Sequence, residues 1–512
     1  MSRILTFQGD HCFELEAVAG ETLLETLRRG GVTLSAPCGG GGKCGKCRVE
    51  LVRDGKRERV LACQTRVEGD CTVYVPVLAG GSICTQGAER SLPCTPGRTG
   101  LGAAVDLGTT TVAVHLYDLT DGSLLGVDSA WNAQAPFGAD VISRCQYVMK
   151  HEAGLTLLCE TMRDQVFSLV GGLIRAAGRG EEPLAELFVA GNTVMEHIFM
   201  GLSPAGLAVA PFRAESLFLG SAPQMIRGVK TWAAPCAASY VGGDIMTGLL
   251  STGLWQKEGV SLFLDVGTNG EMALGGRDGF VCCAVASGPA FEGAGIRCGM
   301  ASTPGAVSDL RWAADGPAPT VIGGGEARGL CGSGLIKLLA LLLEKGVVDE
   351  TGWLLPPEEA PAGYEKWLTE DENGNGCFHL SPTVFLSAAD VRQLQLAKAA
   401  VAAGIQILLE EAGLTAEELD AVYLAGGFGT HLAPEAAAAI GMLPEELVGR
   451  TQAVGNSALA GAAMALLDEQ SREALDEIQS KCRYIELSGN PRFNVLFPEH
   501  MMFCEEDDLE WN

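Results

Sequence analysis

Hydrophobic residues follow one pattern over residues 1–78 and another from residue 101 onward. In the first part, short alternating runs predict β-strands at residues 4–7, 12–16, 48–52 and 72–77. Leucines at positions 23, 24 and 27 share one face of a helix that a Gly-Gly pair would end. Two strands, a helix, a loop and further strands are the order of a β-grasp domain.

Residues 79–100 break this pattern, because glycine, proline, serine and threonine dominate them. That composition predicts a flexible linker whose prolines stiffen its second half. From residue 101, short β-branched strands alternate with helices rich in alanine and leucine. Such alternation is typical of an α/β fold.

The part after the linker repeats itself. An apolar strand ending in Asp-x-Gly-Thr occurs at residues 103–109 and again at 262–268. In each half, a second apolar strand runs into a glycine turn, at residues 187–191 and 422–426. We therefore expect two matching lobes that face a cleft, at residues 101–255 and 256–512. The second lobe is longer and would carry an insertion that includes the acidic stretch near residues 369–376.

Composition limits the function classes. The 512 residues are 47% hydrophobic and 19% charged, which suits large buried cores. The net charge of −27 makes nucleic acids and anionic membrane surfaces poor partners. The first residues lack signal-peptide features, and no uncharged apolar run is long enough for a membrane helix, so a cytoplasmic protein is expected. Its 18 cysteines would then be reduced, which favours metal ligands and buried thiols over disulfides.

Four cysteines near the N-terminus form the strongest local motif. Three lie on a glycine-rich loop, Cys38, Cys44 and Cys47, and Cys63 follows downstream. Four thiolates are the ligand set of a [2Fe–2S] cluster, and glycines let the loop backbone approach the cluster sulfurs.

The same loop allows other interpretations. Four cysteines could hold a structural zinc ion, although a zinc ribbon normally has two CxxC pairs and this chain has one. The loop also fits the P-loop pattern up to Lys46, but Cys47 stands where a Ser or Thr should bind magnesium. Its GxGxxG match follows no convincing strand. We reject both phosphate-loop interpretations.

Two glycine hairpins and one glycine loop predict a nucleotide site. Asp106 and Asp265 each end a strand before a turn, where a carboxylate can hold Mg²⁺ through water. Turn glycines let backbone N–H groups approach phosphate oxygens, and the hydroxyl and amide side chains add donors. The turn residues are Gly108, Thr109 and Thr110 in the first hairpin and Gly267, Thr268 and Asn269 in the second. The loop that would border adenosine contains Gly426, Gly427 and Gly429.

These motifs resemble the phosphate-1, phosphate-2 and adenosine motifs of the ASKHA superfamily, which includes acetate and sugar kinases and actin. Together with an N-terminal [2Fe–2S] domain, they resemble the reductive activators of corrinoid proteins over nearly the whole chain. Supporting stretches lie at residues 132–134, 138–144, 190–195, 240–245, 287–293 and 327–336. The resemblance implies an α+β ferredoxin-like β-grasp domain, followed by a two-lobed, actin-like α/β body with duplicated RNase H-like lobes.

The resemblance also implies roles for individual residues. The two hairpins would bind the phosphates of ATP and Mg²⁺ through Asp106, Thr109, Thr110, Asp265, Thr268 and Asn269. Three further carboxylates, Asp244, Glu271 and Glu292, are candidates to orient the attacking water. The alternative for each of these three is a purely structural hydrogen bond.

The expected function is ATP-dependent reductive activation. One electron would pass from an unidentified cellular donor through the cluster to Co(II) on a corrinoid protein, giving Co(I). The partner would be a methyltransferase subunit or a corrinoid iron–sulfur protein, and the family suggests a homodimer. Two other functions remain open: a small-molecule kinase with a redox-sensing iron–sulfur domain, and a non-enzymatic electron carrier.

Overall fold

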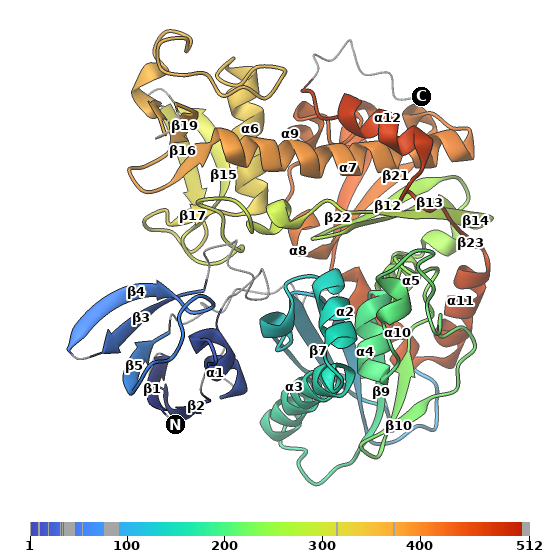
Figure 1. The fold of residues 1–512 in the computed structure, drawn as a ribbon. Coiled ribbons are helices and arrows are strands. Elements are labelled where there is room, and N and C mark those ends of the chain that lie inside the picture. Colours follow the sequence, from blue (N-terminus) through green and yellow to red (C-terminus); the bar gives the residue numbers. More distant parts are fainter. Residues whose placement is uncertain are drawn as a thin grey trace.

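The computed structural model describes residues 2–8, 11–18, 20–30, 32, 34, 47–53, 55–75, 92–313, 316–371 and 374–503. Figure 1 shows a small N-terminal unit beside a larger body made of two lobes. No helix in these ranges is both long enough and apolar enough to cross a membrane.

The N-terminal unit is a five-stranded sheet in the order β2-β1-β5-β3-β4, with one helix packed on it. Its elements are β1 (Ser2–Gln8), β2 (His11–Ala17), α1 (Leu23–Arg29), β3 (Arg48–Arg53), β4 (Lys56–Leu61) and β5 (Cys71–Tyr74). Strands β1 and β5 are parallel, and the other pairs are antiparallel. The three α1 leucines are buried in one core with Ile4 and Val73. The predicted β-grasp fold is confirmed.

Strand β4 was not predicted from the sequence. Its residues are mostly charged and exposed, so they show no alternation of buried and polar positions. The strand lies at the edge of the sheet, where it pairs with β3. Charged edge strands are common because they discourage pairing with other chains.

The first lobe is a six-stranded sheet in the order β10-β11-β9-β6-β7-β8. Its strands are β6 (Leu101–Leu107), β7 (Thr111–Asp118), β8 (Leu124–Trp131), β9 (Leu184–Gly191), β10 (Gln224–Ile226) and β11 (Val229–Ala233). One face is covered by α2 (Val141–Lys150), α3 (Gly154–Ala176) and α4 (Thr193–Met200). Ala103 and Val105 face these helices, whereas Ala104 points to the opposite face, toward helices that lie between the two sheets.

The second lobe repeats this plan in the order β22-β21-β12-β13-β14-β23. Its strands are β12 (Ser261–Val266), β13 (Gly270–Gly276), β14 (Gly279–Val285), β21 (Ala421–Ala425), β22 (Thr451–Gly455) and β23 (Cys482–Tyr484). The long helix α7 (Ala388–Ala412) lies on its outer face, and α12 (Pro491–Glu499) packs against α7 (Figure 1).

Two small sheets lie between β14 and α7 in the chain. They are built from β15 (Ala306–Ala313), β16 (Gly316–Val321) and β17 (Gly329–Leu330), and from β18 (Leu368–Glu370), β19 (Gly376–His379) and β20 (Phe385–Ser387). Helix α6 (Gly332–Glu344) packs on the first of them. The stretch expected in the insertion, near residues 369–376, runs from β18 into β19.

The internal repeat appears in the strand register. Strand β9 runs parallel to β6 and places Ala190 beside Asp106. Strand β21 runs parallel to β12 and places Ala425 beside Asp265. The two aspartates therefore occupy equivalent positions at the ends of equivalent strands, and the predicted duplicated fold is confirmed.

A layer of helices separates the two sheets. It consists of α5 (Gly243–Thr252), α10 (Ser457–Leu467) and α11 (Glu469–Ser480), and its apolar residues share one core with both sheets. Helices α10 and α11 lie between β22 and β23 of the second sheet in sequence, yet α10 packs against β6 and β9 of the first sheet. The predicted lobe boundary between residues 255 and 256 assigns each sheet to its own lobe. It does not assign the central helices in this way, because they share one core with both sheets.

Helices α5 and α10 touch at a glycine. A Cβ atom at Gly461 of α10 would lie 2.0 Å from the carbonyl oxygen of Thr247 in α5. Neither helix could approach the other so closely with a larger residue at this position. Small residues therefore set the spacing of the central layer.

The predicted linker, residues 79–100, is described from Leu92 onward. There the chain lies against the central layer, with the Thr95 N–H donating to the carbonyl of Leu467 at 2.9 Å. The second half of the linker is thus held by hydrogen bonds to the body, which proline stiffness alone did not predict.

We expect Gly461→Ala to lower the apparent melting temperature. The added methyl group must push α5 and α10 apart, at a cost of about 1–3 kcal/mol. Gly172→Ala in α3 is the matched control, because a Cβ atom at Gly172 meets nothing within 4 Å. Removing a glycine from a helix interior there should stabilise by up to about 1 kcal/mol. Thermal unfolding under anaerobic conditions measures both, and an unchanged or raised melting temperature for Gly461→Ala would contradict the packing argument.

Candidate functional site

Two of the four predicted cluster ligands lie side by side in the N-terminal unit. Cys47 precedes β3 and is 1% exposed, and Cys63 follows β4. Their Sγ atoms are 3.3 Å apart. A hydrogen bond of 2.8 Å from the Ala62 N–H to the Cys47 carbonyl fixes the two segments against each other. Cys38 and Cys44 lie outside the described residues.

The cysteine pair fits a shared metal ion. A disulfide would need the sulfurs about 2.05 Å apart. Two thiolates on one tetrahedral ion, with metal–sulfur bonds of about 2.3 Å, lie roughly 3.7 Å apart. The observed 3.3 Å is close to the second value. Both an iron–sulfur cluster and a zinc ion satisfy this geometry, so the pair alone does not choose between them.

Asp106 lies at the end of β6 and faces the central layer. Its Oδ2 accepts a hydrogen bond of 2.8 Å from the Nδ2 of Asn456, the residue that caps α10. Burial raises the pKa of Asp106 to about 6, although this hydrogen bond works in the opposite direction.

Asp265 occupies the equivalent place at the end of β12. Burial, together with repulsion from the nearby Asp106 and Glu292 carboxylates, raises its pKa to about 7. Gly426 comes close to it, with a φ of 81° and no room for a side chain: a Cβ atom there would lie 2.5 Å from Asp265 Oδ1. Glycine is therefore needed for the predicted adenosine loop to cross Asp265.

Asp244 and Glu271 complete a group of four carboxylates. Asp244 is in the first turn of α5. Burial raises its pKa to about 8, helped by repulsion from Asp265 and Asp106. Burial, together with Asp244 and Asp265, also raises the pKa of Glu271 on β13 well above its usual value. Two residues from the first sequence repeat and two from the second thus meet in one inter-lobe site.

Glu292 joins the two predicted phosphate turns. Its Oε1 accepts hydrogen bonds from the N–H and Oγ of Thr268, at 2.9 and 3.0 Å. Its Oε2 accepts from the Oγ of Thr110, at 3.0 Å. The Glu292 carboxylate therefore takes up three donors that the sequence predicted for phosphate, and in doing so it connects the lobes.

A buried arginine donates hydrogen bonds to the backbone of the first phosphate turn and of the segment next to it. Arg144 of α2 is 0% exposed, and its guanidinium donates to the carbonyls of Gly138 and Thr109 and to the amide oxygen of Gln134. Burial lowers its pKa to about 9. Sequence analysis placed Arg144 in a supporting stretch but gave it no role. The signal that could have found it is an arginine in an otherwise apolar helix start.

Amide side chains fix the rest of this turn. Asn132 donates to the carbonyl of Gly108 at 2.8 Å, and Asn192 donates to the Oγ of Thr109 at 2.9 Å. In the second turn, the Oγ of Ser287 donates to the carbonyls of Gly267 and Thr268, at 3.0 and 3.3 Å. Both turns are therefore held in shape by side chains from other segments.

The glycine loop starts the short helix α8 (Gly426–Gly429) directly after β21. A Cβ atom at Gly427 would meet nothing within 4 Å, so this part of the loop faces open space. Phe428 stacks on Phe291 with ring centroids 5.0 Å apart. A small cavity between the lobes is lined by Asn192 and Tyr240 on one side and by Asn269 and Glu271 on the other.

Family models match three successive segments of the chain. Residues 8–68 match a 2Fe–2S iron–sulfur cluster binding domain. Residues 101–257 match the RACo middle region, and residues 259–511 match the C-terminal domain of RACo, the ASKHA domain. The N-terminal unit is thus a [2Fe–2S] domain, and the body includes a nucleotide-binding ASKHA domain.

Two curated proteins and a solved structure resemble most or nearly all of the chain. A corrinoid activation enzyme of Eubacterium limosum, RamQ, is 28% identical over 92% of this chain and 94% of its own. A reductase of Methanosarcina barkeri, described as specific for a Co(II) methylated-amine corrinoid protein, is 24% identical over 74% of this chain and 72% of its own. A solved reductive activator for a corrinoid, iron–sulfur protein is 30% identical, covers 98% of both chains and superposes with a TM-score of 0.71.

We expect Asp244→Asn to stabilise the protein when nucleotide and Mg²⁺ are absent. A buried carboxyl with a raised pKa keeps its proton in the folded state and loses it in the unfolded state. Stability is therefore lost as pH rises from about 4, the unfolded pKa, to about 8, the folded value for Asp244. One such group contributes a slope of at most about 1.4 kcal/mol per pH unit. The advantage of the variant in melting temperature should grow from pH 4 to pH 8.

Asp278→Asn is the control for this measurement, because the Asp278 side chain is fully exposed. Its melting curve should follow that of the wild type at every pH. A difference between Asp244→Asn and wild type that stays constant with pH would show that Asp244 does not titrate as described.

Proposed function

The chain belongs to the family of reductive activators of corrinoid proteins, and from this we propose that it uses ATP to deliver one electron to the Co(II) of a corrinoid protein, giving Co(I). The observation that carries this proposal is the presence of two sites in one chain. One is a cysteine pair with metal-ligand spacing, and the other is a carboxylate site between two glycine turns.

The N-terminal unit supplies the redox half. We assign Cys38, Cys44, Cys47 and Cys63 as cluster ligands, on the spacing of the four and the contact between the last two. A bound [2Fe–2S] cluster supplies one-electron transfer. Cys47 is almost fully buried and Cys63 is half-buried, so the domain encloses this side of the cluster position.

The body supplies the nucleotide half. Asp106 and Asp265 occupy equivalent strand ends and would hold Mg²⁺ through water, since magnesium keeps most of its hydration shell. The turn residues Gly108, Thr109 and Thr110, with Gly267, Thr268 and Asn269, would then bind phosphate oxygens. Gly426, Gly427 and Gly429 would border adenosine, because Gly426 crosses Asp265 and Gly427 faces open space.

Two of the three candidate carboxylates remain suited to orient the attacking water. Asp244 and Glu271 have raised pKa values and few hydrogen-bond partners. The Asp244 pKa of about 8 lies near the ambient pH, where a base works best. Glu292 differs from these two carboxylates, because it accepts three hydrogen bonds from Thr110 and Thr268. Phosphate oxygens would compete with Glu292 for these donors, so nucleotide binding would release the contact between the lobes.

Nucleotide must act by favouring one arrangement of the lobes. A ligand shifts an equilibrium only through different affinities for the two states. An electron at a plant-type cluster, at roughly −400 mV, does not by itself reduce a couple of still lower potential. Binding or hydrolysis of ATP would supply the difference by changing how the body holds its corrinoid partner. The electron donor, a homodimeric state and a cytoplasmic location remain predictions.

We expect Mg-ATP to accelerate Co(I) formation. Reduced protein is mixed anaerobically with a corrinoid protein in the Co(II) state, and the Co(I) absorption spectrum is followed with and without nucleotide. ATP turnover is measured in the same samples, with and without the corrinoid protein. Formation of Co(I) at the same rate without nucleotide would show that ATP plays no part in the reduction of cobalt. Phosphorylation of an acid or sugar, with cobalt untouched, would identify a kinase.

We also expect Cys47→Ser and Cys63→Ser to lose the cluster, because each removes one of four thiolate ligands. Iron, acid-labile sulfide and visible absorption are measured after anaerobic reconstitution. Cys12→Ser is the control: this cysteine lies exposed on β2 of the same sheet. Retention of a full cluster in both ligand variants would show that the metal is bound elsewhere, and zinc without iron in wild type would favour the alternative metal.

A further inference from the structure

Helix α10 begins at the inter-lobe site. Its N-cap residue is Asn456, whose Oδ1 accepts the Leu459 N–H at 2.8 Å. The Nδ2 of the same side chain donates to Asp106 at 2.8 Å. The residue that starts the helix is thus also the residue that contacts the first carboxylate of the site.

The other end of α10 holds the linker to the [2Fe–2S] domain. Arg98 donates to the carbonyls of Leu466 and Leu467, the last two residues of the helix, at 2.5 and 3.0 Å. The N–H of Thr95 also donates to the Leu467 carbonyl, at 2.9 Å. Two linker residues therefore satisfy carbonyl groups that a helix end leaves without intrahelical partners.

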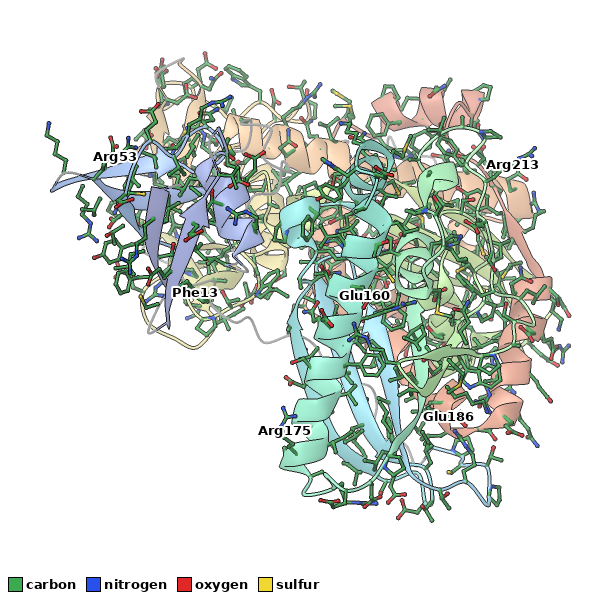
Figure 2. The ribbon with its side chains drawn as sticks, turned by 60° about the horizontal axis from the view of Figure 1, so that its bottom comes forward. Phe13, Arg53, Glu160, Arg175, Glu186 and Arg213 are labelled. Carbon is green, nitrogen blue, oxygen red and sulfur yellow. The ribbon has the colours of Figure 1, made fainter. Side chains whose placement is uncertain are left out.

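Further bonds tie the linker to the start of α11. The Oγ of Thr95 donates to Asp468 at 3.4 Å and accepts from the N–H of Glu469 at 2.9 Å. Arg98 also forms an ion pair of 2.9 Å with Glu186 of β9, and their side chains are only 12% and 13% exposed. Figure 2 labels Glu186 where β9 passes the C-terminal helices. We call residues 95–98 the linker anchor.

A short rigid element separates the two ends. Helix α10 spans 11 residues, which is about 16 Å at 1.5 Å per residue. Beyond the anchor, residues 76–91 connect to the cluster domain. Whatever their conformation, a stretch of that length reaches at most about 60 Å. The anchor thus limits where the cluster domain can move.

The surroundings of α10 suit a sliding movement. It packs on α5 through small residues, with Gly461 against the Thr247 backbone. Helix α5 itself starts at the inter-lobe site, with Asp244 in its first turn. Packed helices with smooth faces can shift along each other by small amounts when two domains close.

We propose that α10 couples the nucleotide site to the linker anchor, so that nucleotide bound at Asp106 changes how firmly residues 95–98 are held. The proposal rests on the proposed function, in that it requires ATP to bind at this site. Bound nucleotide and Mg²⁺ would either weaken or strengthen the hydrogen bond between Asp106 and Asn456. The resulting change at the start of α10 would alter the hydrogen bonds that its other end accepts from Arg98 and Thr95. The anchor would then set the freedom of the cluster domain according to nucleotide state.

Hydrogen exchange of the full-length holoprotein tests the first step. Samples carry the reconstituted cluster and are compared with and without Mg²⁺ and a non-hydrolysable ATP analogue. We expect at least a threefold change in amide exchange for peptides covering residues 92–101. Exchange in these peptides that is the same with and without saturating nucleotide would overturn the proposal.

Variants of the anchor test the second step. Arg98→Gln should leave nucleotide affinity within twofold of wild type and leave Co(I) formation without ATP unchanged. The acceleration by Mg-ATP should fall at least fivefold. Thr95→Val, which removes only the side-chain bonds to Asp468 and Glu469, should act in the same direction if Arg98→Gln proves unstable. Full acceleration by ATP in both variants would overturn the proposal.

Arg492→Gln is the matched control. Arg492 of α12 pairs with Glu410 of α7, on the outer face of the second lobe. It should keep both the nucleotide-dependent exchange and the acceleration by ATP. Failure of the proposed function would look different, because wild type would then fail to bind ATP or to form Co(I). Wild type that does both, with an anchor insensitive to nucleotide, would contradict the coupling alone.

Discussion

Four carboxylates, Asp106, Asp244, Asp265 and Glu271, lie together between the lobes, and the rest of the body has to accommodate their repulsion. Burial disfavours their charged forms, and repulsion within the group adds to the rise in the pKa values of Asp244, Asp265 and Glu271. Such a group is stable when protons or cations neutralise it. Holding it assembled without a ligand therefore costs stability, and a hydrated Mg²⁺ that arrives with a nucleotide would remove that cost. This electrostatic cost is the physical support for the proposal that the nucleotide's Mg²⁺ binds here.

Features that depend on one short segment of the chain could be predicted from the sequence. Each phosphate turn is a strand, an aspartate and a glycine within ten residues, and the duplicated register of Asp106 and Asp265 followed from the same local pattern. The order of the β-grasp elements could be predicted from local patterns. The exception is β4, an edge strand whose charged residues lack the alternation typical of a strand.

The supporting residues could not be predicted in this way. Arg144, Asn192 and Asn456 reach the first turn from segments that are near it only in the folded chain. Asn456 is separated from Asp106 by 350 positions. Nothing in its local sequence distinguishes a helix cap that contacts a buried carboxylate of the inter-lobe site from one that only caps. The same holds for Arg98. Its place in the linker sequence does not indicate that its side chain donates to the last two carbonyls of α10.

Glu292 shows how the two halves of the body can respond to one ligand. Its carboxylate accepts hydrogen bonds from Thr110 of one lobe and Thr268 of the other, in the manner expected of a phosphate group. In the proposed function, a phosphate that took over these donors would bring more charge to the turns and would free Glu292, so contacts between the lobes would be exchanged and not simply added. Exchange of this kind would give two lobe arrangements different affinities for nucleotide, which is the condition for any coupling. The central helices α5 and α10 start beside this exchange and lie between both sheets, so they are the elements whose positions it would alter first.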